Sequence, residues 1–233
     1  MQRIYLPRAS FSDQLILSER QIYHQLTRVL RGRVWNKVIF FDGKKLEDNL
    51  YEIIDINKNE VKLQKKEIIN KSEEQEINLY QSLPNKLNKI EYILQKWVEV
   101  GVSNFYIFTA ERSWELVVSD GKKQRLQKIV VEAIEQSNRN TIPKIEFLDV
   151  LDSADIHGNN LLLHSVQDDS SQKLKDVEID PNMPTNIFIW PEWGFSDSEV
   201  EIFKESNFKK FYLGDRILRT ETAGIVVAFF ISL

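Results

Sequence analysis

The chain has no cysteine, only three histidines and only eight glycines among 233 residues. Without cysteine it forms no disulfide bond and no cysteine-ligated zinc or iron–sulfur site. His24, His157 and His164 show no spacing typical of a metal site, so we expect no metal. The glycines form neither a GxGxxG nor a P-loop motif, and no GxSxG is present. This disfavours Rossmann dinucleotide-binding proteins, P-loop NTPases and serine hydrolases.

Long apolar runs are also missing. The longest, residues 225–231, has seven residues, well short of the roughly 20 that cross a bilayer as a helix. The first seven residues lack the apolar core of a signal peptide. We therefore expect a cytoplasmic protein with no membrane partner, and the absence of cysteine is compatible with that compartment.

The composition, 42% hydrophobic and 28% charged, is typical of a soluble globular protein with one or two domains. The net charge of −4 is unevenly divided. Residues 1–71 carry 14 Lys and Arg against 9 Asp and Glu, a net charge of +5, whereas the remainder carries 17 against 26, a net charge of −9. A basic N-terminal segment followed by an acidic remainder predicts that the N-terminal segment binds the phosphates of a nucleic acid. Ordinary scatter of surface charge explains the same numbers.

Residues 1–71 contain short β-prone runs joined by turn signals, such as Asp42-Gly43 and residues 57–60. They predict a small β-barrel-like module with strands at residues 3–6, 14–17, 34–41, 50–56 and 61–69. A capping-box pattern at residues 18–21 predicts one helix in this module, with Ile22, Leu26, Val29 and Leu30 at helical spacing.

Beyond a polar linker at residues 71–76, strands and helices alternate, which predicts an α/β domain with a parallel sheet. We therefore expect domains at residues 1–71 and 72–233. Two helices are expected around residues 87–98, ended by Gly101, and 126–134, and a second capping box at residues 196–199 begins another. Residues 225–231 fit either a β-branched strand or a buried helix that starts near Thr220.

Residues 213–223 hold the most informative pattern. Gly214 permits a tight turn, Ile217, Leu218 and Ala223 are apolar, and Arg216 and Arg219 are cationic. Apolar walls beside arginines suit a nucleoside cofactor next to a polyanion. A loop that enters a helix capped by Thr220 fits the same residues.

Two segments follow apolar strands, where parallel sheets bind ligands. These are residues 191–194 and the pair Leu213-Gly214. Glu192 is then either a pocket acid or an ordinary turn acid. Arg139 follows the expected second helix, where an arginine either satisfies helix carbonyls or holds a phosphate.

Motifs in one order along the chain resemble the small-subunit (16S) ribosomal RNA uridine N3-methyltransferase family of the SPOUT superfamily. They are His24, residues 28–31, Gln95, Lys96, Glu99, Gly101, Val102, residues 111–113, Glu132, Ala133, Gln136, Ser137, Arg139, Pro191, Glu192, residues 194–196, Glu199, Leu213, Gly214, residues 216–219 and residues 221–223. The resemblance spans nearly the whole chain.

This resemblance implies a PUA-like or OB-like β-barrel followed by a trefoil-knotted α/β domain, with S-adenosyl-L-methionine as cofactor. It also implies a homodimer in which the final apolar run is a helix near the interface. The substrate would be ribosomal RNA or the small ribosomal subunit, methylated at N3 of a uridine.

The resemblance also implies the site residues. Arg139, Arg219 and Arg112 would position the substrate or bind anions, with no general base identified, and Arg28, Arg31 and Arg33 would bind RNA. The cofactor would contact Leu163, His164, Pro191, Glu192, Gly194, Leu213, Gly214, Ile217, Leu218, Arg219, Thr222 and Ala223.

The sequence departs from the family at one loop, where the usual Gly-Pro-Glu-Gly-Gly reads Trp190-Pro191-Glu192-Trp193-Gly194. A bulky ring in place of a glycine narrows a site or clashes where φ is positive. An alternative function is therefore an RNA-binding or ribosome-assembly protein that keeps the architecture with impaired catalysis. A nucleotide-binding α/β enzyme of another chemistry is a third.

Overall fold

The computed structural model describes residues 1–233 except 8–9, 85, 113–117, 149–155, 165–170, 190–193, 195, 197–198, 200–202 and 204–207. The chain forms two compact units. The first unit comprises Met1–Glu73 and Ile134–Ile142, and the second unit comprises Glu74–Ala133 and Pro143–Leu233. The domains expected from the sequence, 1–71 and 72–233, stay a prediction.

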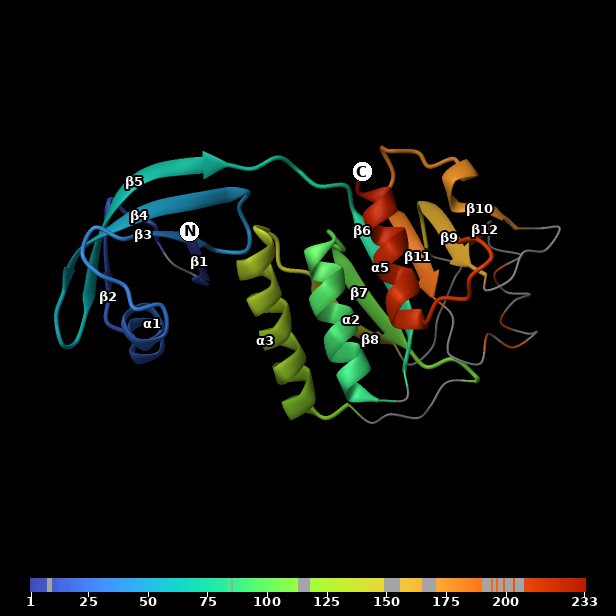
Figure 1. The fold of residues 1–233 in the computed structure, drawn as a ribbon, viewed down its shortest axis with the longest axis horizontal. Coiled ribbons are helices and arrows are strands. Elements are labelled where there is room, and N and C mark those ends of the chain that lie inside the picture. The colour runs from blue at the N-terminus through green and yellow to red at the C-terminus, as the bar shows by residue number, and fades with distance from the viewer. Residues whose placement is uncertain are drawn as a thin grey trace. The chain divides into compact units, whose positions relative to one another are not determined.

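The first unit is built on a five-stranded sheet with the order β1-β3-β4-β5-β2 (Figure 1). Strand β1 runs parallel to β3 and the other pairs are antiparallel. The strands are β1 (Gln2–Tyr5), β2 (Gln14–Leu17), β3 (Lys37–Phe41), β4 (Glu47–Ile56) and β5 (Val61–Asn70). The turn at residues 57–60 forms as expected, because the N–H of Asn57 donates to the carbonyl of Glu60.

The helix of the first unit differs from the expectation. Helix α1 (Arg20–His24) continues into a π-helix, η1 (Gln25–Val29). Leu26 is buried, but Val29 is 63% exposed, so the helical spacing placed Val29 on the wrong face. The N-cap is Glu19, which makes no side-chain capping bond, so the expected capping box is also wrong. A turn at residues 34 and 35 delays β3 to Lys37, later than expected.

The second unit is built on a fully parallel sheet of seven strands, with the order β10-β12-β9-β11-β6-β7-β8. This confirms the α/β fold with a parallel sheet. The strands are β6 (Ile77–Ser82), β7 (Asn104–Phe108), β8 (Lys144–Leu148), β9 (Asn159–Leu163), β10 (Gln172–Lys173), β11 (Thr185–Ile189) and β12 (Lys209–Tyr212). Every residue of β6, β9 and β11 is buried, as the continuous apolar runs predict.

Three long helices belong to the described chain: α2 (Leu87–Glu99), α3 (Asp120–Ser137) and α5 (Thr220–Ile231). A short 3₁₀ turn, η2 (Leu174–Asp176), follows β10. Helix α2 ends as expected at Gly101, whose φ is +98°. Helix α5 contains residues 225–231, which settles the ambiguity of that run in favour of a helix. The capping box at residues 196–199 is also confirmed, with reciprocal bonds between Ser196 and Glu199.

Helices α2 and α5 lie side by side over one face of the sheet (Figure 1). Their contact is close because Gly224 faces the buried ring of Trp97. A Cβ atom at Gly224 would lie 1.2 Å from Cζ2 of Trp97, so only glycine allows the two helices this distance.

An amide ladder joins four neighbouring strands near their amino ends. Asn104 donates to Asn78 (2.7 Å), Asn78 donates to Asn186 (3.0 Å) and Asn186 donates to Asn160 (2.8 Å). Asn78, Asn160 and Asn186 are buried, and a buried amide is costly unless it is paired. The ladder therefore fixes the register of β7, β6, β11 and β9 at their amino ends. The carboxyl ends of these strands lie on the opposite side of the sheet.

Stacked aromatic rings lie on one face of the sheet. Tyr80 stacks on Phe188 with centroids 4.3 Å apart, and on Tyr106 with centroids 4.6 Å apart. Burial raises the pKa of both tyrosines above the ordinary value, so their hydroxyls stay protonated at neutral pH.

Candidate functional site

A pocket of about 410 Å³ lies at the carboxyl ends of β9, β11 and β12 and at the start of α5. This is the edge at which parallel sheets bind ligands. The lining residues are Lys89, Leu163, His164, Ile189, Gly194, Leu213, Gly214, Arg216, Ile217, Leu218, Arg219, Thr220, Glu221 and Ala223.

The pocket combines an apolar interior with a cationic rim. Leu163, Ile189 and Ala223 are buried, whereas Arg216 and Arg219 are exposed. Lys89 adds a third cation and Glu221 a single carboxylate. Such a lining suits a flat apolar ring system that carries an anionic group.

Two glycines shape the pocket wall. The φ angles of Gly194 and Gly214 are +74° and +115°, values that residues with a side chain rarely adopt. A Cβ atom at Gly214 would meet no atom within 4 Å, so the requirement for glycine there is conformational rather than steric.

The pocket also contains the N-terminus of α5. The N-cap is Arg219, whose carbonyl accepts hydrogen bonds from the N–H groups of Thr222 (2.9 Å) and Ala223 (2.8 Å). Thr220 is the first helical residue, so its expected role as the cap is wrong. The positive end of the helix dipole adds to the attraction of this rim for anions.

The structure brings nine of the expected cofactor residues into this pocket: Leu163, His164, Gly194, Leu213, Gly214, Ile217, Leu218, Arg219 and Ala223. Thr222 is exposed on α5 and does not line it. Pro191 and Glu192, with Trp190 and Trp193, lie outside the described residues.

Five lining residues are not among the expected cofactor contacts, although Arg216 was expected to add positive charge beside the pocket: Lys89, Ile189, Arg216, Thr220 and Glu221. Arg216, Thr220 and Glu221 fall within the segment singled out above, and Ile189 ends an expected strand. Lys89 lies in the first turn of α2, directly after β6. Because β6 pairs with β11, the strand order would have indicated Lys89, but the sequence does not provide that order.

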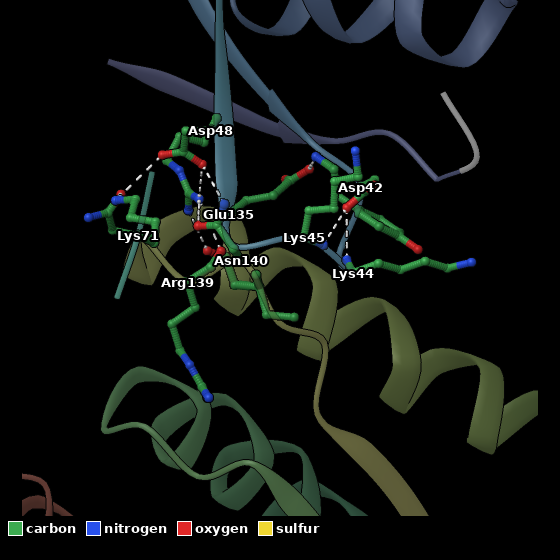
Figure 2. A network of polar contacts seen from close by, with 12 residues as sticks. Asp42, Lys44, Lys45, Asp48, Lys71, Glu135, Arg139 and Asn140 are labelled. Atoms are coloured by element: carbon green, nitrogen blue, oxygen red, sulfur yellow. Dashed lines mark hydrogen bonds and ion pairs between the residues drawn. The ribbon is translucent and has the colours of Figure 1, made fainter. Parts of the chain in front are cut away.

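The three expected substrate arginines lie in different surroundings. Arg219 lines the pocket, and Arg112 is exposed in the turn after β7, both in the second unit. Arg139 belongs to the first unit and is only 4% exposed. Its side chain points away from the polar network in which its backbone takes part (Figure 2).

That network includes Asp48, Arg139 and Asn140 (Figure 2), which all bond to the buried side chain of Arg3. Arg3 donates to Asp48 (2.8 Å), to the Asn140 side-chain oxygen (2.9 Å) and to the Arg139 carbonyl (3.0 Å). Asn140 in turn donates to Asp48 (2.9 Å). The bonds that Arg3 donates, all made by the two terminal nitrogens of the guanidinium, tie residues 134–142 to the sheet of the first unit.

A second carboxylate in the same view, Asp42, closes a tight turn (Figure 2). Its side chain accepts backbone hydrogen bonds from Lys44 (2.8 Å) and Lys45 (2.9 Å). Partial burial alone would raise the pKa of Asp42, but these N–H donors and the Lys45 charge lower it below the ordinary value. The Asp42 carboxylate therefore stabilises the turn, and we assign it no role in acid–base chemistry.

Within the described ranges, His, Asp and Glu form no group of three or more that could bind a metal. Among the same residues, no helix has both the length and the apolar character that crossing a membrane requires.

The sequence pattern of the RNA methyltransferase domain family matches residues 71–232. The chain belongs to this family. Two relatives, each named ribosomal RNA small subunit methyltransferase E, are similar over most of their length. The Bacillus subtilis protein is 32% identical over 86% of this chain and 82% of its own. The Borreliella burgdorferi protein, whose name carries the suffix 2, is 31% identical over 90% of this chain and 87% of its own.

Solved structures of a ribosomal RNA methyltransferase and a putative methyltransferase match the same architecture. A ribosomal RNA small subunit methyltransferase E from Neisseria gonorrhoeae, bound to S-adenosyl methionine, has a TM-score of 0.84 at 27% identity, covering 99% of this chain and 96% of its own. A putative methyltransferase from Legionella pneumophila, in complex with the bound cofactor SAM, has a TM-score of 0.80 at 27% identity, covering 98% and 96%. The likeness extends through both units of the chain.

Proposed function

We propose that this protein transfers a methyl group from S-adenosyl-L-methionine to N3 of a uridine in small-subunit ribosomal RNA. The observation that carries the proposal is the pocket at the carboxyl ends of β9, β11 and β12. Family membership and the relatives' names support methylation of this RNA. The uridine and its N3 atom come from the resemblance of the sequence motifs.

The pocket residues fit the cofactor in size and chemistry. A volume of about 410 Å³ lies within the roughly 300–1,000 Å³ that small-molecule sites occupy. Leu163, Ile189 and Ala223 would pack against the adenosine, and the turn at Gly214 would allow close approach of the backbone. Arg216 or Lys89 would hold the carboxylate of the methionine part.

The cofactor, when bound, supplies a methyl group on a positively charged sulfur. The protein must orient the uridine and favour the loss of its weakly acidic N3 proton. Fixed positive charge beside the base stabilises the resulting anion, which is the role proposed for Arg219 and Arg112 of the second unit. The target base would leave its stack before reaction.

We propose that the first unit positions the RNA through Arg28, Arg31 and Arg33, all exposed. In the second unit, the proposed architecture is a SPOUT-type trefoil knot. That architecture is implied by the resemblance of the sequence motifs, and the similar solved structures support the α/β fold in which it would lie.

The decisive experiment is transfer of a radiolabelled methyl group to ribosomal RNA from cells that lack this protein, followed by mapping of the modified nucleotide. Labelled 3-methyluridine in small-subunit RNA is the expected result. RNA binding without methyl transfer would instead support the alternative, an assembly protein with impaired catalysis, which Trp190 and Trp193 suggest.

Arg219→Ala should lower the rate of methyl transfer about 100-fold, the loss typical when one group that stabilises an anion is removed. Cofactor affinity, measured by calorimetry, should change less than the rate. Arg125→Ala is the matched control, because Arg125 is an exposed arginine that pairs with Glu91 outside the pocket. Turnover of Arg219→Ala equal to that of the control would remove Arg219 from the site.

We propose a homodimer through the exposed face of α5. Val226, Phe229 and Phe230 are 42–54% exposed and Leu233 is 89% exposed, so one end of the chain presents an apolar patch. Phe229→Asp should convert a dimer to a monomer in light scattering, whereas Ile16→Asp, at an exposed residue of β2, should not. A wild-type protein that is monomeric at micromolar concentration would contradict the proposal.

A further inference from the structure

Trp35 combines exposure with an unfavourable backbone conformation. Its side chain is 74% exposed and its φ is +76°. For a bulky residue, positive φ is a conformational outlier. Since the exposed ring gains little from packing, neither the local conformation nor the core explains a tryptophan at this position.

The turn around Trp35 is well defined by hydrogen bonds. The N–H of Asn36 donates to the carbonyl of Arg33 (3.0 Å), and the N–H of Arg33 donates to the Asn36 side chain (2.9 Å). Trp35 therefore occupies the third position of a β-turn of type II pattern, where glycine or asparagine is preferred. The N–H of Trp35 also donates to Ile53 of β4 (2.8 Å), so the indole projects from a fixed backbone.

A second residue of the same loop shares this feature. Arg31 has a φ of +51° and follows Leu30, the C-cap of η1, at a helix-end position that usually holds glycine. Of the three non-glycine residues with positive φ in the described chain, two are Arg31 and Trp35. One loop thus holds a cation and an aromatic ring in conformations that favour glycine.

The charge around the loop has one sign. Residues 20–41 contain no Asp or Glu, and they contain Arg20, Arg28, Arg31, Arg33 and Lys37. All five of these side chains are exposed. An exposed ring on a well-defined turn among exposed cations is the arrangement that binds single-stranded nucleic acid, in which cations follow the phosphates and an aromatic face stacks on a base.

We propose that Trp35 is a stacking platform for one unpaired base of the RNA that Arg28, Arg31 and Arg33 bind. The inference rests on the proposed RNA substrate and adds a residue outside the cofactor pocket. It also assigns a role to the conformational cost at Trp35, because a ring on a backbone held by hydrogen bonds has only its side-chain torsions to lose when a base stacks on it.

Binding is measured by fluorescence anisotropy with a labelled single-stranded RNA of about 12 nucleotides, within the range of site sizes of such proteins. Trp35→Gly and Trp35→Asn remove the ring and suit positive φ, so thermal unfolding should stay unchanged or shift upward by a few degrees. Both variants should bind roughly 5- to 150-fold more weakly, the equivalent of about 1–3 kcal/mol per stacked base. Trp35→Phe should retain affinity within about threefold, because every aromatic face stacks.

Salt titration separates stacking from charge. The slope of affinity against salt should be the same for Trp35→Gly and wild type, whereas Arg28→Ala should make it shallower. Ile68→Ala is the control, because Ile68 is an exposed apolar residue of β5 in the same unit. Unchanged binding by Trp35→Gly, a shallower slope for it, or an equal loss in Ile68→Ala would overturn the inference.

The outcomes also distinguish this inference from the proposed function. If the wild-type protein methylates RNA and Trp35→Gly binds RNA as tightly as wild type, the stacking inference is refuted and the proposed function is not. Wild-type protein that binds RNA through Trp35 but transfers no methyl group refutes the enzyme and supports stacking. A Trp35→Gly defect seen with assembled small subunits but not with free RNA would assign Trp35 to a ribosomal protein partner instead, which also overturns the inference.

Discussion

Gly224→Ala should destabilise the protein by about 3 kcal/mol, near the upper end of the usual cost of overpacking a core. The new methyl group would lie 1.2 Å from Cζ2 of Trp97, so α5 must move away from α2. Thermal unfolding should show a midpoint lowered by roughly 6–12 °C. Cofactor binding should weaken as well, because the first turn of α5 lines the pocket.

A matched control makes this result diagnostic, since alanine is normally the better helix former by up to about 1 kcal/mol. Gly121 lies in α3, and a Cβ atom there would meet nothing within 4 Å, so Gly121→Ala should stabilise the protein slightly. Trp97→Leu combined with Gly224→Ala should recover part of the loss, measured as a coupling energy in a double-mutant cycle. A neutral Gly224→Ala would show that the two helices are not packed this closely.

Gly214→Val should weaken S-adenosyl-L-methionine binding about 100-fold, or roughly 2.7 kcal/mol. A β-branched residue does not adopt a φ of +115°, so the turn must change its path and carry Leu213 and the following pocket residues with it. Isothermal titration calorimetry measures the effect directly.

Gly101→Val controls for backbone strain. Gly101 has a φ of +98°, and a Cβ atom there would come no closer than 3.9 Å to Ser232, but Gly101 does not line the pocket. Both variants should lose comparable stability, and only Gly214→Val should lose the cofactor. Equal affinities of the two variants for S-adenosyl-L-methionine would show that the Gly214 turn does not contribute to cofactor binding.

The parallel sheet and the edge that holds the pocket could be predicted from the sequence. Continuous apolar runs such as residues 161–163 mark strands buried on both faces, and ligands bind at the carboxyl ends of such strands. The segment 213–223 stood out because glycine, apolar residues and arginines occur together within it. The expected lining residues follow from these local signals and from the resemblance.

Features that depend on distant contacts could not be predicted. Strand β8 was not expected, because its residues are mostly half-buried at the sheet edge and show no apolar run. The π-helix η1 ends with Gly32 donating to Leu26 (2.8 Å), close to Ile53 on β4, and helical spacing carries no information about that contact. Lys89 lines the pocket because β6, which precedes it, pairs with β11. The order of strands is also a property of the whole sheet.

The buried pair Arg3–Asp48 has a consequence for how the chain is divided. Asn140 and the carbonyls of Ile134 and Arg139 accept three of the four hydrogen bonds that Arg3 donates to described residues, although they lie more than 130 residues further along the chain. A gene fragment that stops after β5 would encode the basic sheet, but of these four bonds it would leave Arg3 with the one to Asp48, and it would leave Asp48 without Asn140. The first unit is therefore discontinuous, and any graft of it onto another protein has to carry both of its pieces.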